Sequence, residues 1–157
     1  MSAIKNWSTE IGEERTVGEI IGLLSSKGAR SVHIEYDDKQ RPAGIEFIIN
    51  VLDVPIPFRL PCDFDGVFKY MVKTYKDDNA RRRFERNPES LKQSRRAAWR
   101  IIKNWVEAQM AIIDAGQASM AQVFLPYIRF QAEGGITMYD KFLKQLSSQK
   151  SLTGGAQ

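Results

Sequence analysis

The stretch that decides the fold is residues 31–60, SVHIEYDDKQRPAGIEFIINVLDVPIPFRL. Apolar and polar residues alternate through residues 31–36, 43–52 and 54–60, which is the pattern of β-strands with one buried face. The polar stretch 37–41 separates the first two of these segments. Because the three segments are consecutive and their connections are short, we expect them to form a three-stranded antiparallel meander.

The second and third strands have different expected places in this sheet. The second carries large apolar residues on one face and should lie over the core, with Ile45, Phe47, Ile49 and Val51 directed inward. The third contains Pro55 and Pro57, and Pro61 follows it. Proline has no N–H to donate to a neighbouring strand, so the third strand is predicted at the edge of the sheet.

Helical patterns flank the sheet on both sides. Before it, Thr16 and Glu19 have the spacing of a capping box, and residues 17–26 have an apolar face, which predicts a short helix. After it, residues 76–86 are polar and predicted to be a loop or a frayed helix. The helices expected in this half are 64–75 with Asp63 as cap, a long one at 87–115 that Asn87 and Pro88 start, 120–125 and 137–146.

These elements predict an α+β protein: a short N-terminal helix, a three-stranded antiparallel meander, and a helical C-terminal half with one long helix. At 157 residues and 43% hydrophobic content the chain fits one domain with its own core. We place a polar lead-in at residues 1–15, a single domain at 16–146 and a disordered tail at 147–157. The apolar runs are too short to cross a bilayer and the N-terminus lacks the apolar core of a secretory signal. We therefore expect a cytoplasmic protein without a membrane partner.

Positive charge is concentrated in residues 81–103, RRRFERNPESLKQSRRAAWRIIK. This stretch holds nine of the 23 basic residues, and Glu85 and Glu89 are its acids, so nine bases against two acids give it a net charge of +7. The whole chain carries +4, so the remainder is slightly acidic. Concentrated positive charge attracts a polyanion in a way that scattered charge does not, which favours nucleic acid as the partner.

The predicted binding residues follow from helical spacing. Residues at intervals of four, four and three fall on one side of the long helix and are predicted to hold phosphates: Lys92, Arg96, Arg100 and Lys103. Arg95 lies beside them, and a flexible clamp is expected before the helix from Arg81, Arg82, Arg83 and Arg86. Phe84, Trp99 and Trp105 are candidates for stacking on unpaired bases. The two tryptophans fit the core or an interface better than stacking.

Catalytic chemistry is not indicated. His33 and Cys62 are the only histidine and cysteine, so a histidine-based metal cluster cannot form, and a Cys–His nucleophilic pair would require an exposed strand residue to meet a thiol beyond the edge strand. Glycine-rich phosphate loops are absent. Turns and helix caps explain each pair of neighbouring acids. We therefore predict no enzymatic activity, no catalytic residue, no cofactor and no metal.

Several segments of the C-terminal half carry a resemblance to a known family. They are AWRIIKNW at 98–105, AQMAII at 108–113 and VFLPY at 123–127; in the N-terminal half TVGEI at 16–20 and IEYD at 34–37 fit the same pattern. These segments resemble a family of short, uncharacterised proteins carried by bacteriophages, prophages and mobile elements. The resemblance implies a phage or mobile-element origin, and hence residence in the cytoplasm of a host cell, and it implies no activity.

The leading hypothesis is a small non-enzymatic phage-type accessory protein that binds nucleic acid, with DNA favoured, through the basic surface of residues 81–103. Two alternatives stay open beside an ordinary solvated face. The basic surface would suit an acidic host protein of a defence or nucleic-acid-processing complex. The second alternative is a virion or assembly component that self-associates, with contacts supplied by Phe124, Tyr127 and Phe130.

Overall fold

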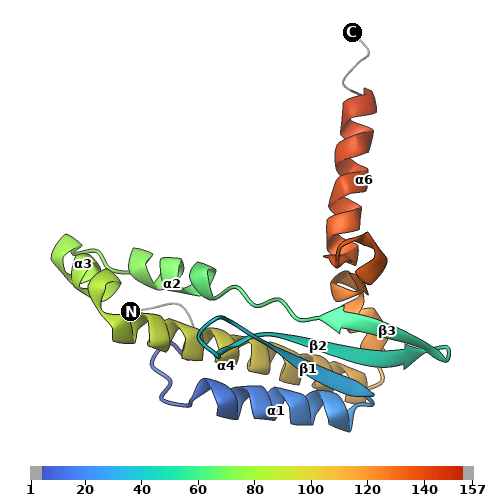
Figure 1. Cartoon of the computed structure of the whole chain (residues 1–157), viewed down its shortest axis with the longest axis horizontal. Helices are drawn as coiled ribbons and strands as arrows, with labels where there is room; N and C mark the ends of the chain where they lie inside the picture. Colours follow the sequence, from blue (N-terminus) through green and yellow to red (C-terminus); the bar gives the residue numbers. More distant parts are fainter. Residues whose placement is uncertain (1–4, 154–157) are drawn as a thin grey trace.

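A three-stranded antiparallel sheet in the order β1-β2-β3 lies at the centre of this computed structural model, which describes residues 5–153 (Figure 1). The strands are β1 (Ser31–Tyr36), β2 (Pro42–Val51) and β3 (Val54–Arg59), and each bound lies within one residue of its predicted place. In the middle strand, Phe47 is opposite Val32 of β1 and Phe58 of β3. The meander and the edge position of the proline-containing strand are therefore confirmed.

The helices confirm the α+β class and the single long helix. Six α-helices are present in the described residues: α1 (Glu13–Ser26), α2 (Phe64–Lys73), α3 (Asp78–Arg86), α4 (Pro88–Asp114), α5 (Met120–Phe124) and α6 (Met138–Thr153). Short connecting elements join α5 to α6, namely η1 (Leu125–Tyr127), β4 (Arg129–Phe130), η2 (Gln131–Glu133) and β5 (Ile136–Thr137). Across residues 5–153 the structure contains no helix both long enough and apolar enough to span a bilayer.

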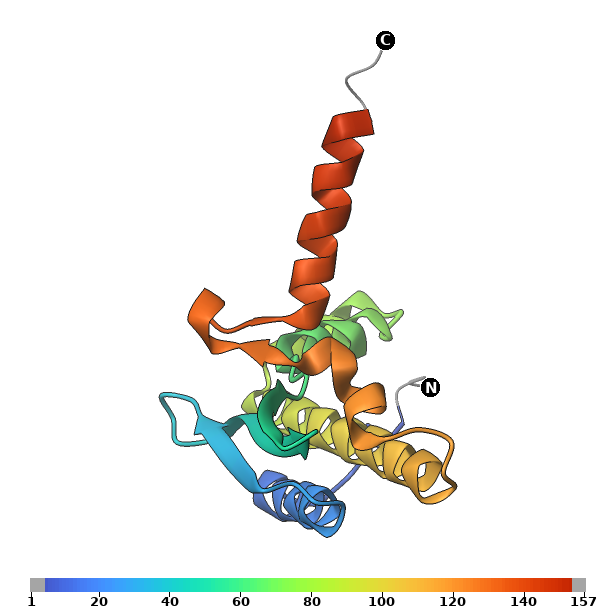
Figure 2. The same ribbon diagram turned by 90° about the vertical axis from the view of Figure 1, so that its right-hand side faces the viewer.

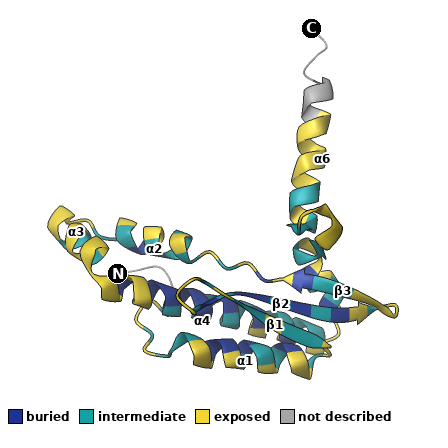
Figure 3. Cartoon of the chain, viewed as in Figure 1, coloured by how far each residue is buried: buried dark blue, intermediate teal, exposed yellow. Residues whose placement is uncertain are grey.

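The core lies between the sheet and the helices α1 and α4, which run side by side along it (Figures 1 and 2). Figure 3 shows the buried positions gathered on the facing sides of these elements. The ring of Phe47 stacks on Phe58 at 5.3 Å and meets the edge of Phe124 at 5.2 Å between centroids. Because β2 is the middle strand, this aromatic group joins the sheet to the helical half.

The first helix starts earlier than its sequence predicts. It begins at Glu13 with Gly12 as N-cap, so residues 13–15 of the predicted lead-in are helical. Two acids in the first turn, Glu13 and Glu14, favour this start because they face the positive end of the helix dipole. The predicted capping box is wrong: the Thr16 hydroxyl lies inside the helix and donates to the Gly12 carbonyl at 3.2 Å.

Two further segments are more helical than expected. Residues 78–86, predicted as a loop or frayed helix, form α3, and the Asp77 carboxylate caps it by accepting the Ala80 N–H at 2.6 Å. The last helix ends at Thr153 instead of residue 146, so it extends into the predicted disordered tail. Residues 147–153 contain neither glycine nor proline, which allows the helix to continue. The rest of that tail, 154–157, is outside the described residues.

Candidate nucleic-acid interface

The nine predicted basic residues divide between two helices with different surroundings. Five of them belong to α4: Lys92, Arg95, Arg96, Arg100 and Lys103. The other four belong to α3, which lies at one end of the elongated body and packs against α2 and α4 (Figure 1): Arg81, Arg82, Arg83 and Arg86. The contacts of each group decide which bases are available to a ligand.

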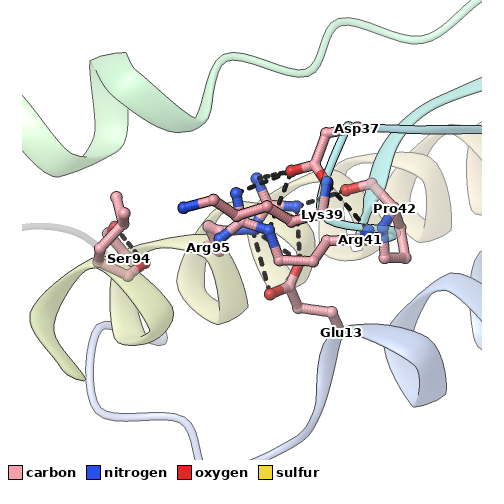
Figure 4. Close-up of polar contacts among 8 residues, drawn as sticks. Glu13, Asp37, Lys39, Arg41, Pro42, Ser94 and Arg95 are labelled. Atoms are coloured by element: carbon pink, nitrogen blue, oxygen red, sulfur yellow. Dashed lines mark hydrogen bonds and ion pairs between the residues drawn. The ribbon is translucent and has the colours of Figure 1, made fainter. Parts of the chain in front are cut away.

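Arg95 is an internal residue and not the predicted phosphate contact. Its side chain is 6% exposed. The guanidinium donates to the Glu13 carboxylate at 3.0 Å and to the Pro42 carbonyl at 2.6 Å (Figure 4). It also lies 4.3 Å from the centre of the Phe64 ring. These contacts join α4 to α1, β2 and α2. The prediction for Arg95 is corrected: its neighbours are acids and carbonyls brought by other elements, which leave it no route to a phosphate.

A second carboxylate, Asp37, completes the surroundings of Arg95 at 3.9 Å (Figure 4). Asp37 accepts hydrogen bonds from the Arg41 side chain at 2.9 Å and from the backbone N–H groups of Lys39 at 2.9 Å and Arg41 at 3.0 Å. The Arg41 hydrogen bonds, first that of the side chain, lower the pKa of Asp37 to about 2. Asp37 is therefore ionised at neutral pH, as the cation beside it requires.

Two bases of the predicted stripe on α4 are also engaged within the chain. Arg100 donates to Glu19 of α1 at 2.5 Å, and Lys103 to Glu107 at 2.7 Å. Both basic side chains are 14% exposed. The helical spacing places these residues on one side of α4 as predicted, but there Arg100 meets Glu19 of α1 and Lys103 meets Glu107 of α4 itself. Two acids thus already occupy the positions that phosphates were expected to take.

The first turns of α4 are more open. Lys92 is exposed and pairs with Glu89 at 2.7 Å, and Arg96 makes a long hydrogen bond of 3.4 Å to the Gln93 side chain. Water screens an exposed pair such as Lys92–Glu89, which therefore contributes little to stability, so a phosphate competes with it easily. Lys92 and Arg96 are therefore accessible to an anion while Arg95, Arg100 and Lys103 are not.

The basic residues of α3 are the best candidates for a binding surface. Arg82, Arg83 and Arg86 are exposed, and their side chains make no hydrogen bond or ion pair to any residue that the structure describes. Together with Asn79 and Asn87 they line one hollow of about 470 Å³. Their neighbour Arg81 differs, since it pairs with Asp78 at 2.8 Å. We call Arg82, Arg83 and Arg86 the α3 arginine cluster.

The hollow also receives the positive end of α4. Asn87 is both the C-cap of α3 and the N-cap of α4. As the N-cap, its side chain accepts a hydrogen bond from the Glu89 N–H at 3.0 Å. The 27-residue helix therefore begins beside the α3 arginine cluster, and its dipole adds positive potential there. Repulsion among three neighbouring guanidinium groups is relieved when an anion enters. Nothing in the local sequence pattern shows which side of α3 borders this hollow, so Asn79 and Asn87 were not predicted as lining residues.

The aromatic residues do not form the predicted stacking surface. Trp99 is fully buried, 5.4 Å from Phe64 between ring centroids, so its candidacy for base stacking is withdrawn. Trp105 is half-buried and meets Phe124 and Tyr127 edge-on, at 5.5 and 5.4 Å. Phe84 also faces inward and packs against the rings of Phe68 and Tyr75. All three residues thus hold elements together.

An exposed indole that sequence analysis missed lies beside α4. Trp7 is 41% exposed, and its carbonyl accepts a hydrogen bond from the Gln93 side chain at 2.6 Å. The same amide donates to the Thr9 carbonyl at 2.9 Å, so Gln93 fixes this segment against the helix. The sequence feature that could have indicated this residue is a single tryptophan in the mostly polar segment 1–15. Its contact with Gln93 of α4 becomes visible only in the folded chain.

The one cysteine and the one histidine of the chain lie in different surroundings. Burial raises the pKa of the Cys62 thiol to about 11. His33 is exposed on β1. Among the described residues, no group of three or more histidine, cysteine, aspartate or glutamate side chains is placed to hold a metal ion.

Cys62 should therefore react slowly with alkylating reagents. At pH 8, a thiol with a pKa near 11 is about 0.1% thiolate, against roughly a quarter for a free cysteine. We expect iodoacetamide to modify native protein about 100-fold more slowly than urea-unfolded protein, as followed by mass spectrometry. Equal rates in the two states would show that the thiol is not buried.

The comparisons with known proteins add no further assignment. The chain matches no family model, no curated protein and no solved structure. The resemblance of residues 98–127 to phage and mobile-element proteins therefore stays a prediction.

Proposed function

We propose that this protein binds nucleic acid through the α3 arginine cluster, with DNA as the favoured form. The observation that carries the proposal is the division of the basic residues. Arg95, Arg100 and Lys103 of α4 are engaged by carboxylates of the chain itself, whereas the three cluster arginines lie unpaired around one hollow. A binding surface for a polyanion requires basic side chains that are not already paired with acids of the same chain.

The chemistry of the hollow suits a phosphate group. A guanidinium offers planar pairs of N–H donors that match two phosphate oxygens, and two amide side chains, Asn79 and Asn87, add neutral donors at the rim. Lys92 and Arg96 on the adjoining turns of α4 would extend the contact along the backbone of the same strand. Such contacts fix the position of a nucleic acid without reading its bases, so the binding is expected to be independent of sequence.

On this proposal the protein acts as a non-enzymatic accessory factor. The resemblance to phage and mobile-element proteins supports a role in a host cell, where nucleic acid is abundant. The Trp7 indole, exposed beside α4, offers a face on which an unpaired base stacks. A preference for single strands over duplex would follow from that contact.

The first test is fluorescence anisotropy of labelled single- and double-stranded DNA at 50 and 200 mM salt. If three phosphates are neutralised, counterion release predicts that the association constant falls about 40-fold for duplex and about 20-fold for single strands between these concentrations. Binding that does not change with salt would contradict the phosphate contacts. Absence of binding at the lower salt would overturn the proposed function.

A matched pair of variants separates the cluster from net charge. We expect Arg82→Gln/Arg83→Gln/Arg86→Gln to weaken binding about tenfold or more, because each charged hydrogen bond contributes about 1.5–3 kcal/mol. The control is Arg15→Gln/Arg30→Gln/Lys39→Gln, which removes the same charge at three exposed positions outside α3 and α4. Equal losses in the two variants would mean that net charge alone attracts the DNA.

A further inference from the structure

The side chains of the α3 arginine cluster surround one place instead of following a line. Four residues at helical intervals of three and four lie on one face of the nine-residue helix: Asn79, Arg82, Arg83 and Arg86. All four line the same hollow of about 470 Å³. Cations that track a nucleic-acid backbone are spread along a groove, where each meets a different phosphate. Three guanidinium groups around one hollow are instead arranged to meet a single phosphate.

The charge of this hollow suits a phosphate monoester better than a phosphodiester. Three unpaired guanidinium groups line it, and no carboxylate of the described residues does. An internal phosphodiester brings one negative charge, whereas a monoester carries about −1.5 to −2 at pH 7 and has three free oxygens. The monoester therefore relieves more of the repulsion among the guanidinium groups and offers more acceptors to their N–H groups.

The acids nearest to the hollow do not take the place of such a ligand. Asp78 of α3 pairs with Arg81 at 2.8 Å. Glu89 in the first turn of α4 pairs with Lys92 at 2.7 Å. By helical spacing Glu85 lies on the flank of α3, away from the centre of the arginine face. The positive charge of the hollow is therefore left for an anion from outside the chain.

Asn87 presents a donor to the same hollow. Its side-chain oxygen accepts the Glu89 N–H at 3.0 Å as the cap of α4. This bond fixes the orientation of the amide, because the amide nitrogen cannot accept a hydrogen bond. The nitrogen itself makes no hydrogen bond within the part of the chain that the structure describes, so it remains free to donate. With the three guanidinium groups it surrounds the hollow with donors, which suit the oxygens of an anion.

The hollow offers no surface on which a base stacks. All five residues that line it are arginines or asparagines, without an aromatic or aliphatic side chain among them. Its volume lies within the range of about 300–1,000 Å³ that small-ligand sites occupy. The group that it recognises is therefore the phosphate, and the base next to that phosphate stays outside.

We propose that the hollow captures the terminal phosphate of a nucleic-acid strand, a phosphate monoester at its 5′ or 3′ end. This inference rests on the proposed function, because the rest of the strand is held by the cations already assigned to its backbone. Lys92 and Arg96 lie about 8 and 14 Å beyond Asn87 along α4. They are spaced along the helix, as contacts to successive internal phosphates require, whereas the cluster converges on the end.

The experiment compares single-stranded DNA oligonucleotides of one sequence, about 12 nucleotides long, with an internal fluorophore that leaves both ends free. One has hydroxyls at both ends, one a 5′ phosphate and one a 3′ phosphate. At least one phosphorylated strand should bind about tenfold more tightly in fluorescence anisotropy, because charged hydrogen bonds to the monoester are added. The end whose phosphate raises the affinity identifies the source. A hydroxyl-ended strand longer by one nucleotide adds one phosphodiester and should gain less than about twofold.

Asn87→Asp tests the position of the phosphate. Aspartate caps a helix as well as asparagine does, and a negative charge is favourable at this end of α4, so the melting temperature should not fall. The free amide donor becomes a carboxylate oxygen, which repels the phosphate, and the preference for the phosphorylated end should drop below about twofold. The matched control is Asn50→Asp, the same change at an exposed position of β2, which should keep the preference.

The possible results separate this capture from the proposed function. If the three strands bind equally and their binding falls with salt, the cluster holds internal phosphates; the proposed function then stands and the capture of an end is overturned. If no strand binds at 50 mM salt, both are overturned. A preference that persists in Asn87→Asp, or that Asn50→Asp abolishes equally, would place the strand end outside the hollow and overturn the proposal.

Discussion

An Arg95→Ala variant should lose about 3–5 kcal/mol of unfolding free energy. The substitution leaves the Glu13 carboxylate, whose side chain is 14% exposed, without the cation that compensates for its burial. The Pro42 carbonyl also loses the donor at 2.6 Å. A buried charge without its partner is among the most destabilising changes that a single substitution makes. Urea denaturation followed by circular dichroism measures the loss.

Companion variants identify the cause. Arg95→Met keeps much of the packing over Phe64 but removes the charge, so it should be nearly as damaging as alanine. Adding Glu13→Gln to Arg95→Met should recover part of the loss, because the uncompensated charge is then gone. Arg96→Ala, one residue along the helix, should change the stability by less than about 0.5 kcal/mol. A loss below about 1 kcal/mol in Arg95→Ala would show that this ion pair does not join α4 to α1.

The second large effect is expected at the centre of the core, where Phe47→Ala should cost about 3–5 kcal/mol. Phe47 is fully buried, and it contacts Phe58 of β3 and Phe124 of α5. Removal of its ring leaves a cavity between the sheet and the helices that neighbouring rings fill only in part. Thermal and urea unfolding should both report the change.

Two comparisons make this test specific. Phe47→Leu retains more of the buried volume and should lose clearly less than alanine. Tyr36→Ala removes an aromatic side chain that is 56% exposed on β1, and its effect should stay below about 1 kcal/mol. If Phe47→Ala cost less than 1 kcal/mol, the middle strand would not lie over the core.

Elements with local signals were predictable from the sequence. The three strands follow from alternation, and the starts of α2 and α4 follow from Asp63 and Asn87, whose side chains accept the N–H groups of Gly66 and Glu89. The α3 segment was predicted as a loop or a frayed helix, although Asp77 provides a local cap, because its apolar packing is tertiary. It carries many charges, and the ring of Phe84 finds its partners Phe68 and Tyr75 only after folding.

The candidate site was predictable as a region but not residue by residue. Charge density pointed to residues 81–103, and helical spacing correctly put Arg100 and Lys103 on one side of α4. The sequence did not show that Arg95 and Arg100 meet carboxylates of α1, because Glu13 lies 82 residues from Arg95 and Glu19 lies 81 residues from Arg100. Which bases stay free is therefore decided mainly by long-range packing, and the three unpaired arginines belong to the segment predicted as a loop or a frayed helix.

The junction between α3 and α4 has a consequence for the thermodynamics of binding. Asn87 is extended, with φ −84° and ψ 117°, and Pro88 follows it. A residue before proline is disfavoured in the helical region, so the two helices cannot merge into one continuous rod. The bend is thus fixed by covalent geometry and held by the Asn87 cap. Arginines presented from a joint of this stiffness are preorganised, and a ligand that meets them loses affinity chiefly to the ordering of the side chains and little to that of the backbone.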